Sequence, residues 1–301
     1  MNQPMPILFD KASLRQHRDR AAANYDNFSF LKDEAAIRVI DRLELVRRDF
    51  NLCLDFGCHD GVLSRHLAGL GKINTVMHAD LSPKFARNAL AHGPSIACDI
   101  DRVPFSPNSF DAVFSCLTMH WVDDLPGVMT QMRSVLKPDG LLLVSMLGGN
   151  SLNELRSALA AAESEIDGGL SPRCAPMADI RDIGGLLGRA GLALPVADSD
   201  RLTITYPNMF RLMADLRGMG EQNALMDRLR RPTSRALFMR AADIYQAEYG
   251  NDDGTIPASF EIITLTGWAP HESQQKPLRP GSATHRLADI LNSEEQDPES
   301  S

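Results

Sequence analysis

A glycine-containing turn follows a short apolar run near the beginning of the chain and has residue types that could hold a cofactor. The turn is LDFGCHDG, residues 54–61, in which Gly57 and Gly61 lack a Cβ atom and so let the backbone approach a ligand closely. The dinucleotide fingerprint GxGxxG would place glycines at positions 59 and 62, where this chain has His59 and Val62, so NAD or FAD is disfavoured. A purely structural turn is the alternative.

Carboxylates end three successive apolar runs in this part of the chain. Asp80 ends the run after the turn, where a carboxylate accepts hydrogen bonds from both hydroxyls of a ribose. Asp99 ends the next run, where a carboxylate accepts from an adenine amino group and Ile100 packs on the ring. Asp55 would orient the turn or lie near a positively charged sulfonium. Each carboxylate alone could be a helix N-cap or a solvated strand end, but three in this order predict a nucleoside cofactor.

Candidate catalytic residues come after the fourth apolar run and in a later helical block. His120 suits a general base or a hydrogen-bonded wall, and the adjacent Trp121 suits a core anchor. Asp215 and Glu221 are acidic residues that could contact a substrate. A solvated helix face is the alternative for both carboxylates.

The sequence predicts neither a metal site nor a disulfide framework. His78, Asp80 and His120 formally match the HxD and distant His of non-haem iron enzymes, but Asp80 is assigned to ribose and His78 lies inside an apolar run. The 5 cysteines form an odd set without a CxxC pair, which indicates reduced surroundings.

Apolar runs alternate with helical patterns through the first half of the chain, as in a parallel sheet covered by helices on both faces. We therefore predict an α/β fold: a doubly wound, mostly parallel seven-stranded sheet with N-terminal helices and a helical cap insertion. In such a sheet the strand ends that carry the three carboxylates meet at one edge. The predicted strands are residues 52–56, 73–80, 95–98, 110–116, 141–147, 202–206 and 260–267.

The predicted organisation has a helical lid at residues 1–50, a cofactor-binding domain at 51–272 with its cap at about 207–255, and a polar, flexible tail at 273–301. An arginine-rich run, RLRRPTSR at 228–235, is placed on a cap helix and its break at a proline. It would be a solvated face or a dock for an acidic partner.

Composition excludes several classes of protein. The chain has 301 residues, of which 44% are apolar, so it is large enough for a substantial core. Its formal charge of -8 gives no overall field that favours nucleic acid. The longest apolar stretch, at 141–147, is too short for a membrane span, and the N-terminus has neither a signal nor a transit pattern. We therefore expect a cytoplasmic location.

The motifs identify the chain as a member of a known superfamily by resemblance. Residues 54–61, 79–82, 98–123 and 135–147 resemble the successive motifs of class I S-adenosylmethionine (SAM) dependent methyltransferases. The chain is similar almost throughout to the methyltransferase-like assembly factors of respiratory complex I, described as arginine hydroxylases. The blocks specific to that family are FDKASLRQHRDRAA (9–22), GGLSPRCAP (168–176), YPNMFRLMADLRGMGE (206–221), NDDGTIPASFEI (251–262) and GWAPHESQ (267–274).

The resemblance implies SAM as cofactor, bound also by His59 and Leu81, and a complex I subunit as protein substrate. It also implies a cytoplasmic protein in a bacterium, or one on the mitochondrial matrix side in a eukaryote, with at most peripheral membrane association. The family usually has glycine where this chain has His59, so replacing His59 by Gly should raise cofactor affinity. Two other functions stay open: methyl transfer, for instance to a malonyl carrier protein in biotin synthesis, and a non-catalytic assembly chaperone. We expect similarity to the malonyl methyltransferases to fade after the fifth strand.

Overall fold

The computed structural model describes residues 6–275. Among these residues, 6–270 belong to one compact unit, and 271–275 do not belong to it. Most of the predicted tail at 273–301 therefore lies outside the described residues.

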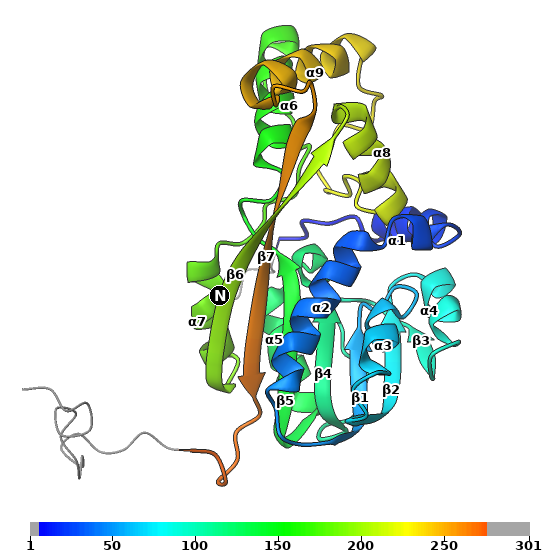
Figure 1. Ribbon diagram of the computed structural model, residues 1–301, viewed down its shortest axis with the longest axis vertical. Helices are drawn as coiled ribbons and strands as arrows, with labels where there is room; N and C mark the ends of the chain where they lie inside the picture. Colours follow the sequence, from blue (N-terminus) through cyan, green and yellow to red (C-terminus); the bar gives the residue numbers. More distant parts are fainter. Residues whose placement is uncertain (1–5, 276–301) are drawn as a thin grey trace, which may run out of the picture. The chain divides into compact units, whose positions relative to one another are not determined.

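The sheet has seven strands in the order β3-β2-β1-β4-β5-β7-β6, which confirms the predicted fold (Figure 1). Strands β1 to β5 run parallel, and β7 is antiparallel to both of its neighbours. The strands are β1 (Phe50–Phe56), β2 (Ile73–Asp80), β3 (Ser95–Ala97), β4 (Phe110–Cys116), β5 (Leu136–Leu147), β6 (Ala193–Tyr206) and β7 (Ile256–Trp268).

Strand β6 is much longer than the predicted 202–206. It is an edge strand with mostly exposed or half-buried side chains, so its first half lacks the apolar pattern of a buried strand. Two of its acidic residues, Asp198 and Asp200, form ion pairs with Arg42 and Arg38 of helix α2 (Phe30–Glu44). These ion pairs explain why β6 is a strand although its charged residues are typical of a loop.

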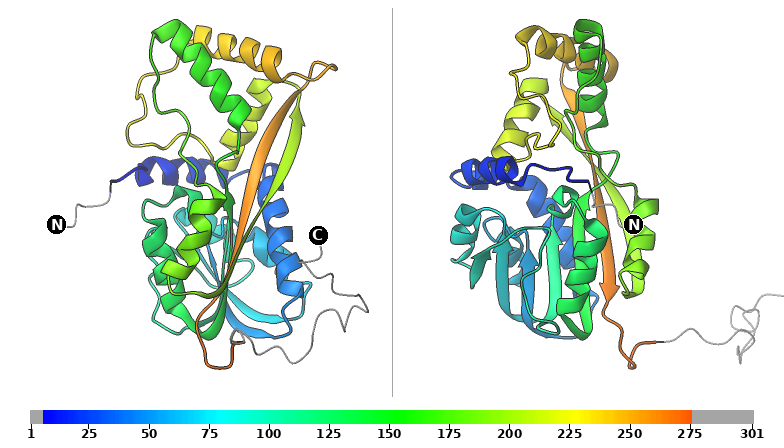
Figure 2. Two further views of the ribbon diagram at one scale, coloured as in Figure 1. Left: turned by 90° about the vertical axis from the view of Figure 1, so that its left-hand side faces the viewer. Right: turned by 180° about the vertical axis from the view of Figure 1, so that it is seen from behind.

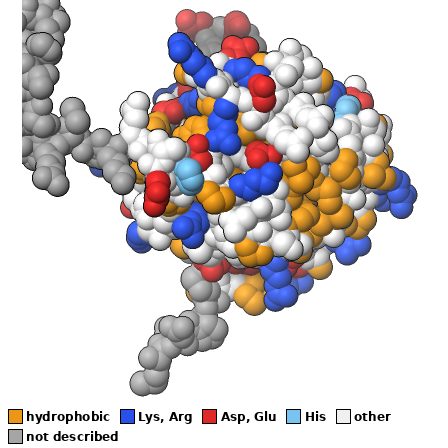
Figure 3. Space-filling model, turned by 90° about the horizontal axis from the view of Figure 1, so that it is seen from below, with side chains coloured by type: hydrophobic (Ala, Val, Ile, Leu, Met, Phe, Trp, Pro, Cys, Tyr) orange, Lys and Arg blue, Asp and Glu red, His pale blue; other side chains and the backbone are white. Residues whose placement is uncertain are grey.

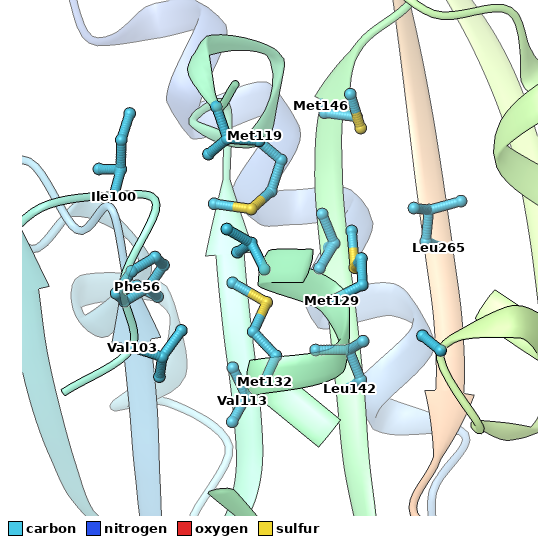
Figure 4. Packing of buried hydrophobic residues seen from close by; sticks show 14 of the residues in the cluster. Phe56, Ile100, Val103, Val113, Met119, Met129, Met132, Leu142, Met146 and Leu265 are labelled. Atoms are coloured by element: carbon cyan, nitrogen blue, oxygen red, sulfur yellow. The ribbon is translucent and has the colours of Figure 1, made fainter. Parts of the chain in front are cut away.

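Helices cover both faces of the sheet, and alternate residues of each central strand point to opposite faces. Cys53 and Phe114 pack with α2 and α3, whereas Leu54 and Val113 pack with α5 and α7. The methionines Met119, Met129, Met132 and Met146 fill much of the second layer (Figure 4). The remaining bounds are α1 (Lys11–Ala21), a 3-10 turn (Tyr25–Asn27), α3 (Val62–Leu67), α4 (Pro83–Ala89), a second 3-10 turn (Met119–Trp121), α5 (Leu125–Val135) and α7 (Ile180–Arg189).

The cap lies beyond the carboxyl ends of the parallel strands and has its own apolar core (Figure 2). It consists of α6 (Asn153–Asp167), α8 (Met209–Met219) and α9 (Arg235–Tyr249), with the adjoining ends of β6 and β7. Thus α6, which precedes the predicted cap range, packs with it. Residues 228–234 of the arginine-rich run lie in the loop between α8 and α9, not on a helix, and Arg235 begins α9 three residues after Pro232, which cannot donate to a helical ladder.

The surface at the opposite end of the sheet mixes charges of both signs. Viewed from that end, basic and acidic side chains are interspersed around an area of hydrophobic side chains (Figure 3). Buried polar residues gather instead at the carboxyl ends of the strands. Helix α1 lies across these ends, beneath the cap (Figures 1 and 2).

Candidate functional site

The turn after β1 adopts backbone conformations that explain its glycines. Gly57 has φ +80° and Gly61 has φ +86°, a region that favours glycine. A Cβ atom on Gly57 would lie 2.1 Å from Thr118 Oγ1, so the turn packs too closely against the segment after β4 for a side chain there. The turn is also tied to the next strand, because Gly57 N donates to Ala79 O at 2.7 Å.

Asp80 is completely buried at the end of β2 and holds this turn. Its Oδ2 accepts from His59 N at 2.9 Å, and its Oδ1 accepts from Ser82 N at 2.8 Å. Arg18 of α1 brings Nη1 within 3.8 Å of Oδ1. The carboxylate is therefore placed where the sequence predicted it, at the strand end beside the glycine turn.

His59 is the least ordinary residue of the turn. It has φ +51°, although it is not glycine, and its ring stacks on Tyr25 and packs against Phe85. Lys32 Nζ lies 2.5 Å from His59 Nδ1 and donates to Gly57 O at 2.6 Å. Burial, reinforced by the charge of Lys32, holds the pKa of His59 well below its ordinary value, so the ring is neutral.

Asp55 lies beneath the turn as a buried carboxyl whose two oxygens have no hydrogen-bond partner among residues 6–275. Burial raises the pKa of Asp55 to about 7, and the Lys32 charge opposes that shift. Ile100 is fully buried and packs in the core with Phe56 (Figure 4). Leu81 is half-buried against the same core, and Asp99 is exposed, with Oδ1 accepting from Asp101 N.

The side chains around the turn fit a nucleoside cofactor in chemistry but leave little space in this conformation. The gap between His59, Lys32 and Tyr25 has a volume of about 10 Å³, whereas ligand pockets hold roughly 300 Å³ or more. The buried carboxyl of Asp55 and the buried guanidinium of Arg18 both lack hydrogen-bond partners in the described part of the chain. A ligand of the size of SAM thus requires the His59 and Lys32 side chains to turn aside.

His120 and Glu221 come together although they are 101 positions apart. His120 Nε2 lies 3.2 Å from Glu221 Oε2, and Trp121 Nε1 donates to the same oxygen at 2.5 Å. Burial acts to raise the pKa of Glu221, but the His120 hydrogen bond and charge, with Arg18 and Trp121, lower it overall. Glu221 is therefore an ionised carboxylate.

A cavity of about 380 Å³ lies between this carboxylate and the cap. Glu221, Leu31 and Leu147 line both this cavity and the small gap beside His59, so the two spaces adjoin. Most of its wall is apolar, and the polar side chains that line it include His17, Ser171, Arg173, Arg217 and Glu221.

Asp215 does not join this group. It lies on α8 within 3.2 Å of Arg211 Nη2, and its charge acts on Tyr206. It is absent from the lining of the 380 Å³ cavity.

Two cationic residues, Arg18 and Lys32, were not predicted as site residues. Both look like members of charged, solvated helices, yet both are almost completely buried. Helical spacing gives a signal that could have found them: Arg18 lies on the face of Leu14 and Ala21, and Lys32 on the face of Ala36 and Val39.

Residues 54–144 match the family model described as a methyltransferase domain. A curated relative, "Arginine-hydroxylase NDUFAF5, mitochondrial" of Danio rerio, is 39% identical over 94% of this chain and 89% of its own length. The protein of that name from Homo sapiens is 39% identical over 94% of this chain and 83% of its own length. The chain belongs to the NDUFAF5 arginine-hydroxylase family. The family lies within the class I methyltransferases, as the resemblance implied.

A second group of relatives extends further along the chain than expected. "Malonyl-[acyl-carrier protein] O-methyltransferase" of Methylovorus sp. is 31% identical over 87% of this chain and 90% of its own length. The expectation that this similarity fades after the fifth strand was therefore wrong. The malonyl methyltransferases share the early motifs and the cap with this chain. The arginine-hydroxylase relatives are distinguished from them by their higher sequence identity to the chain, 39% against 31%.

Solved structures share the fold. A putative methyltransferase from Bacillus halodurans has a TM-score of 0.55 at 14% identity and covers 78% of this chain and 98% of its own. Phosphoethanolamine N-methyltransferase 2 of Haemonchus contortus, solved with SAM, has a TM-score of 0.53 at 17% identity, covering 86% of this chain and 60% of its own.

Two features are absent from the described residues. No helix within 6–275 is long and apolar enough to cross a membrane. In the same range, no group of three or more His, Cys, Asp and Glu side chains is arranged to hold a metal ion.

Proposed function

We propose that this protein binds SAM at the carboxyl ends of β1 to β3 and hydroxylates an arginine of a respiratory complex I subunit during assembly. The name carried by its 39% identical relatives supports an arginine substrate. It works where complex I is assembled, with at most peripheral attachment to the membrane.

The residues that would hold SAM come from the strand ends. Asp80 would accept from the ribose hydroxyls, Asp99 would accept from the adenine amino group, and the 57–61 turn would contact the methionine part. Asp55 supports the turn from beneath. When bound, SAM supplies a positively charged sulfonium with an activated methyl group.

The observation that carries the proposal is the ionised carboxylate of Glu221 at the wall of the cap cavity. Its Oε2 is held by His120 and Trp121, while Oε1 accepts no hydrogen bond from the described residues. A planar guanidinium pairs best with such a carboxylate, since it offers two parallel N–H donors. The largely apolar wall would bury the aliphatic stem of an arginine and exclude water.

Mass spectrometry of the client subunit tests the proposal. In cells that lack this gene, the arginine should lose the mass of one oxygen atom, and the wild-type gene should restore it. The Glu221→Gln variant should restore little of it because a neutral amide holds a guanidinium weakly. Glu165→Gln is the matched control, since Glu165 is an exposed carboxylate that pairs with Arg240 and should restore the mark fully.

Each outcome discriminates among the three hypotheses. Persistence of the oxygen mark without the gene would refute hydroxylation, and loss of one methylene mass instead would show methyl transfer. A biotin requirement in the same strain would favour the malonyl reaction, which the 31% identical relatives suggest. An unchanged spectrum with impaired complex I would favour a chaperone.

A further inference from the structure

Helix α1 places an arginine side chain in the interior without a hydrogen-bonding partner. Arg18 is completely buried, and none of its Nε, Nη1 and Nη2 atoms forms a hydrogen bond within the described residues. Its only ion-pair contact there is with Asp80, at 3.8 Å, which is too long for a hydrogen bond. Both oxygens of Asp80 already accept backbone N–H groups.

Burying the guanidinium without hydrogen bonds costs free energy of folding, and another interaction has to offset this cost. A buried charge is tolerated when it is paired and hydrogen-bonded, and a guanidinium has five N–H donors to satisfy. A second anion beside Arg18 would supply the hydrogen-bond acceptors that Asp80 does not. A carboxylate matches the planar fork of the guanidinium best.

The surroundings of Arg18 place that anion at the cofactor site. Its charge acts on His59 of the cofactor turn, on Tyr25, whose ring stacks on His59, and on Glu221 of the cap cavity. Its backbone packs against Gly220, next to Glu221, and α1 packs against α4 and α8. The guanidinium thus lies beside the ribose acceptor Asp80, and its charge reaches Glu221, which lines both adjoining cavities.

We propose that Arg18 binds the carboxylate at the amino-acid end of the cofactor. This inference rests on the proposed function, because it takes SAM as the ligand of the 57–61 turn. The ribose and the amino-acid end of SAM are joined through sulfur, so a group that adjoins both Asp80 and the turn reaches the carboxylate. Arg18 then orders α1 over the bound cofactor.

Calorimetry with two ligands isolates the contribution of the cofactor carboxylate to binding affinity. S-adenosylhomocysteine carries this carboxylate, and decarboxylated S-adenosylhomocysteine keeps the nucleoside and the ammonium but lacks it. In the Arg18→Met variant, the affinity for S-adenosylhomocysteine should fall at least about tenfold. The affinity for the decarboxylated ligand should change less than about twofold. Arg20→Met is the matched control, because Arg20 is exposed on the same helix and should change neither.

Two further measurements separate binding from a structural role. Arg18→Lys should recover part of the preference for the carboxylate ligand, since it keeps the charge. Without ligand, Arg18→Met should unfold at an unchanged or higher temperature. Equal losses for both ligands, or an unchanged affinity for S-adenosylhomocysteine, would overturn the role of Arg18 alone. A wild-type chain that binds neither ligand would overturn the proposed function and this inference together.

Discussion

Asp55 and His59 are ionisable side chains whose protonation depends on burial more than on residue type. Both are buried at the carboxyl end of β1, and neither oxygen of Asp55 has a hydrogen-bond partner among the described residues. In water each would be charged or half-charged at neutral pH. In the interior, the neutral form gains wherever an opposite charge is missing.

Asp55 should make stability depend on pH. Its folded pKa of about 7 exceeds the ordinary value of 3.8, so the folded form binds the proton more tightly than the unfolded chain. This group therefore stabilises the fold least above pH 7, and its contribution is lost as pH rises from about 4 to about 7. Between pH 5 and pH 8, wild-type stability should fall by about 2 kcal/mol relative to Asp55→Asn, measured by urea unfolding. Parallel pH profiles would contradict the buried, unpaired carboxyl.

Replacing His59 by Gly should raise affinity for S-adenosylhomocysteine several-fold in calorimetry. The ring and Lys32 fill the space beside the turn, and glycine adopts the observed φ of +51° without strain. Asn108→Gly is the control, because Asn108 also has positive φ but lies in an exposed turn. If both variants gain equally, relief of backbone strain is the cause; if neither gains, the His59 ring does not crowd the ligand.

Among the secondary-structure elements, helix α6 anchors the loop that walls the cap cavity. Glu163 on α6 accepts hydrogen bonds from Ser171 and from two nitrogens of Arg173, and both of these residues line the cavity. The Arg173 hydrogen bond, with those of Ser171, lowers the pKa of Glu163 to about 2. The loop 168–179 has little regular structure, so these contacts fix its position.

Glu163→Gln should loosen this loop. Loss of the charge-assisted bonds should reduce stability by about 1–3 kcal/mol and speed proteolytic cleavage within residues 168–179. In the wild type, the same loss should appear as pH falls from about 4.5 towards 2, because the contribution exists only while Glu163 is ionised. Glu165→Gln, which removes an exposed pair with Arg240, should leave cleavage unchanged. Equal cleavage of the two variants would show that Glu163 does not fix the loop.

At the scale of the molecule, the cap and the sheet have separate apolar cores but share strands. β5, β6 and β7 each run from the sheet layer into the cap, and their backbone pairing is continuous there. Paired strands thus connect the cap directly to the sheet. We expect one cooperative transition for the unit as far as Pro270.

The two tryptophans report on different parts of this unit. Trp121 lies beside Glu221 at the cap, and Trp268 ends β7 at the far end of the sheet. In Trp121→Phe and Trp268→Phe, urea unfolding followed by the remaining tryptophan should coincide with unfolding followed by far-UV circular dichroism. Transitions that separate in either variant would show that cap and sheet unfold independently.

The sequence by itself determined the strands of the parallel sheet and the polar residues at their ends. Continuous apolar runs followed by glycine or aspartate identify buried strands and their carboxyl ends, and β2 and β4 have their predicted bounds. Asp80 lies beside the glycine turn for this reason, since parallel strands end at one edge of a sheet. Similarity over the whole chain supplied the family.

Only the tertiary structure decided which charged residues are buried and which distant residues meet. Arg18 and Lys32 look like solvated helix charges until α1 and α2 pack on the sheet, and Glu221 reaches His120 only because the cap folds back over β4. The polar first half of β6 forms a strand because β7 supplies its hydrogen bonds and α2 supplies cations for its acids. Burial and long-range pairing depend on neighbours far along the chain, and local spacing does not encode them.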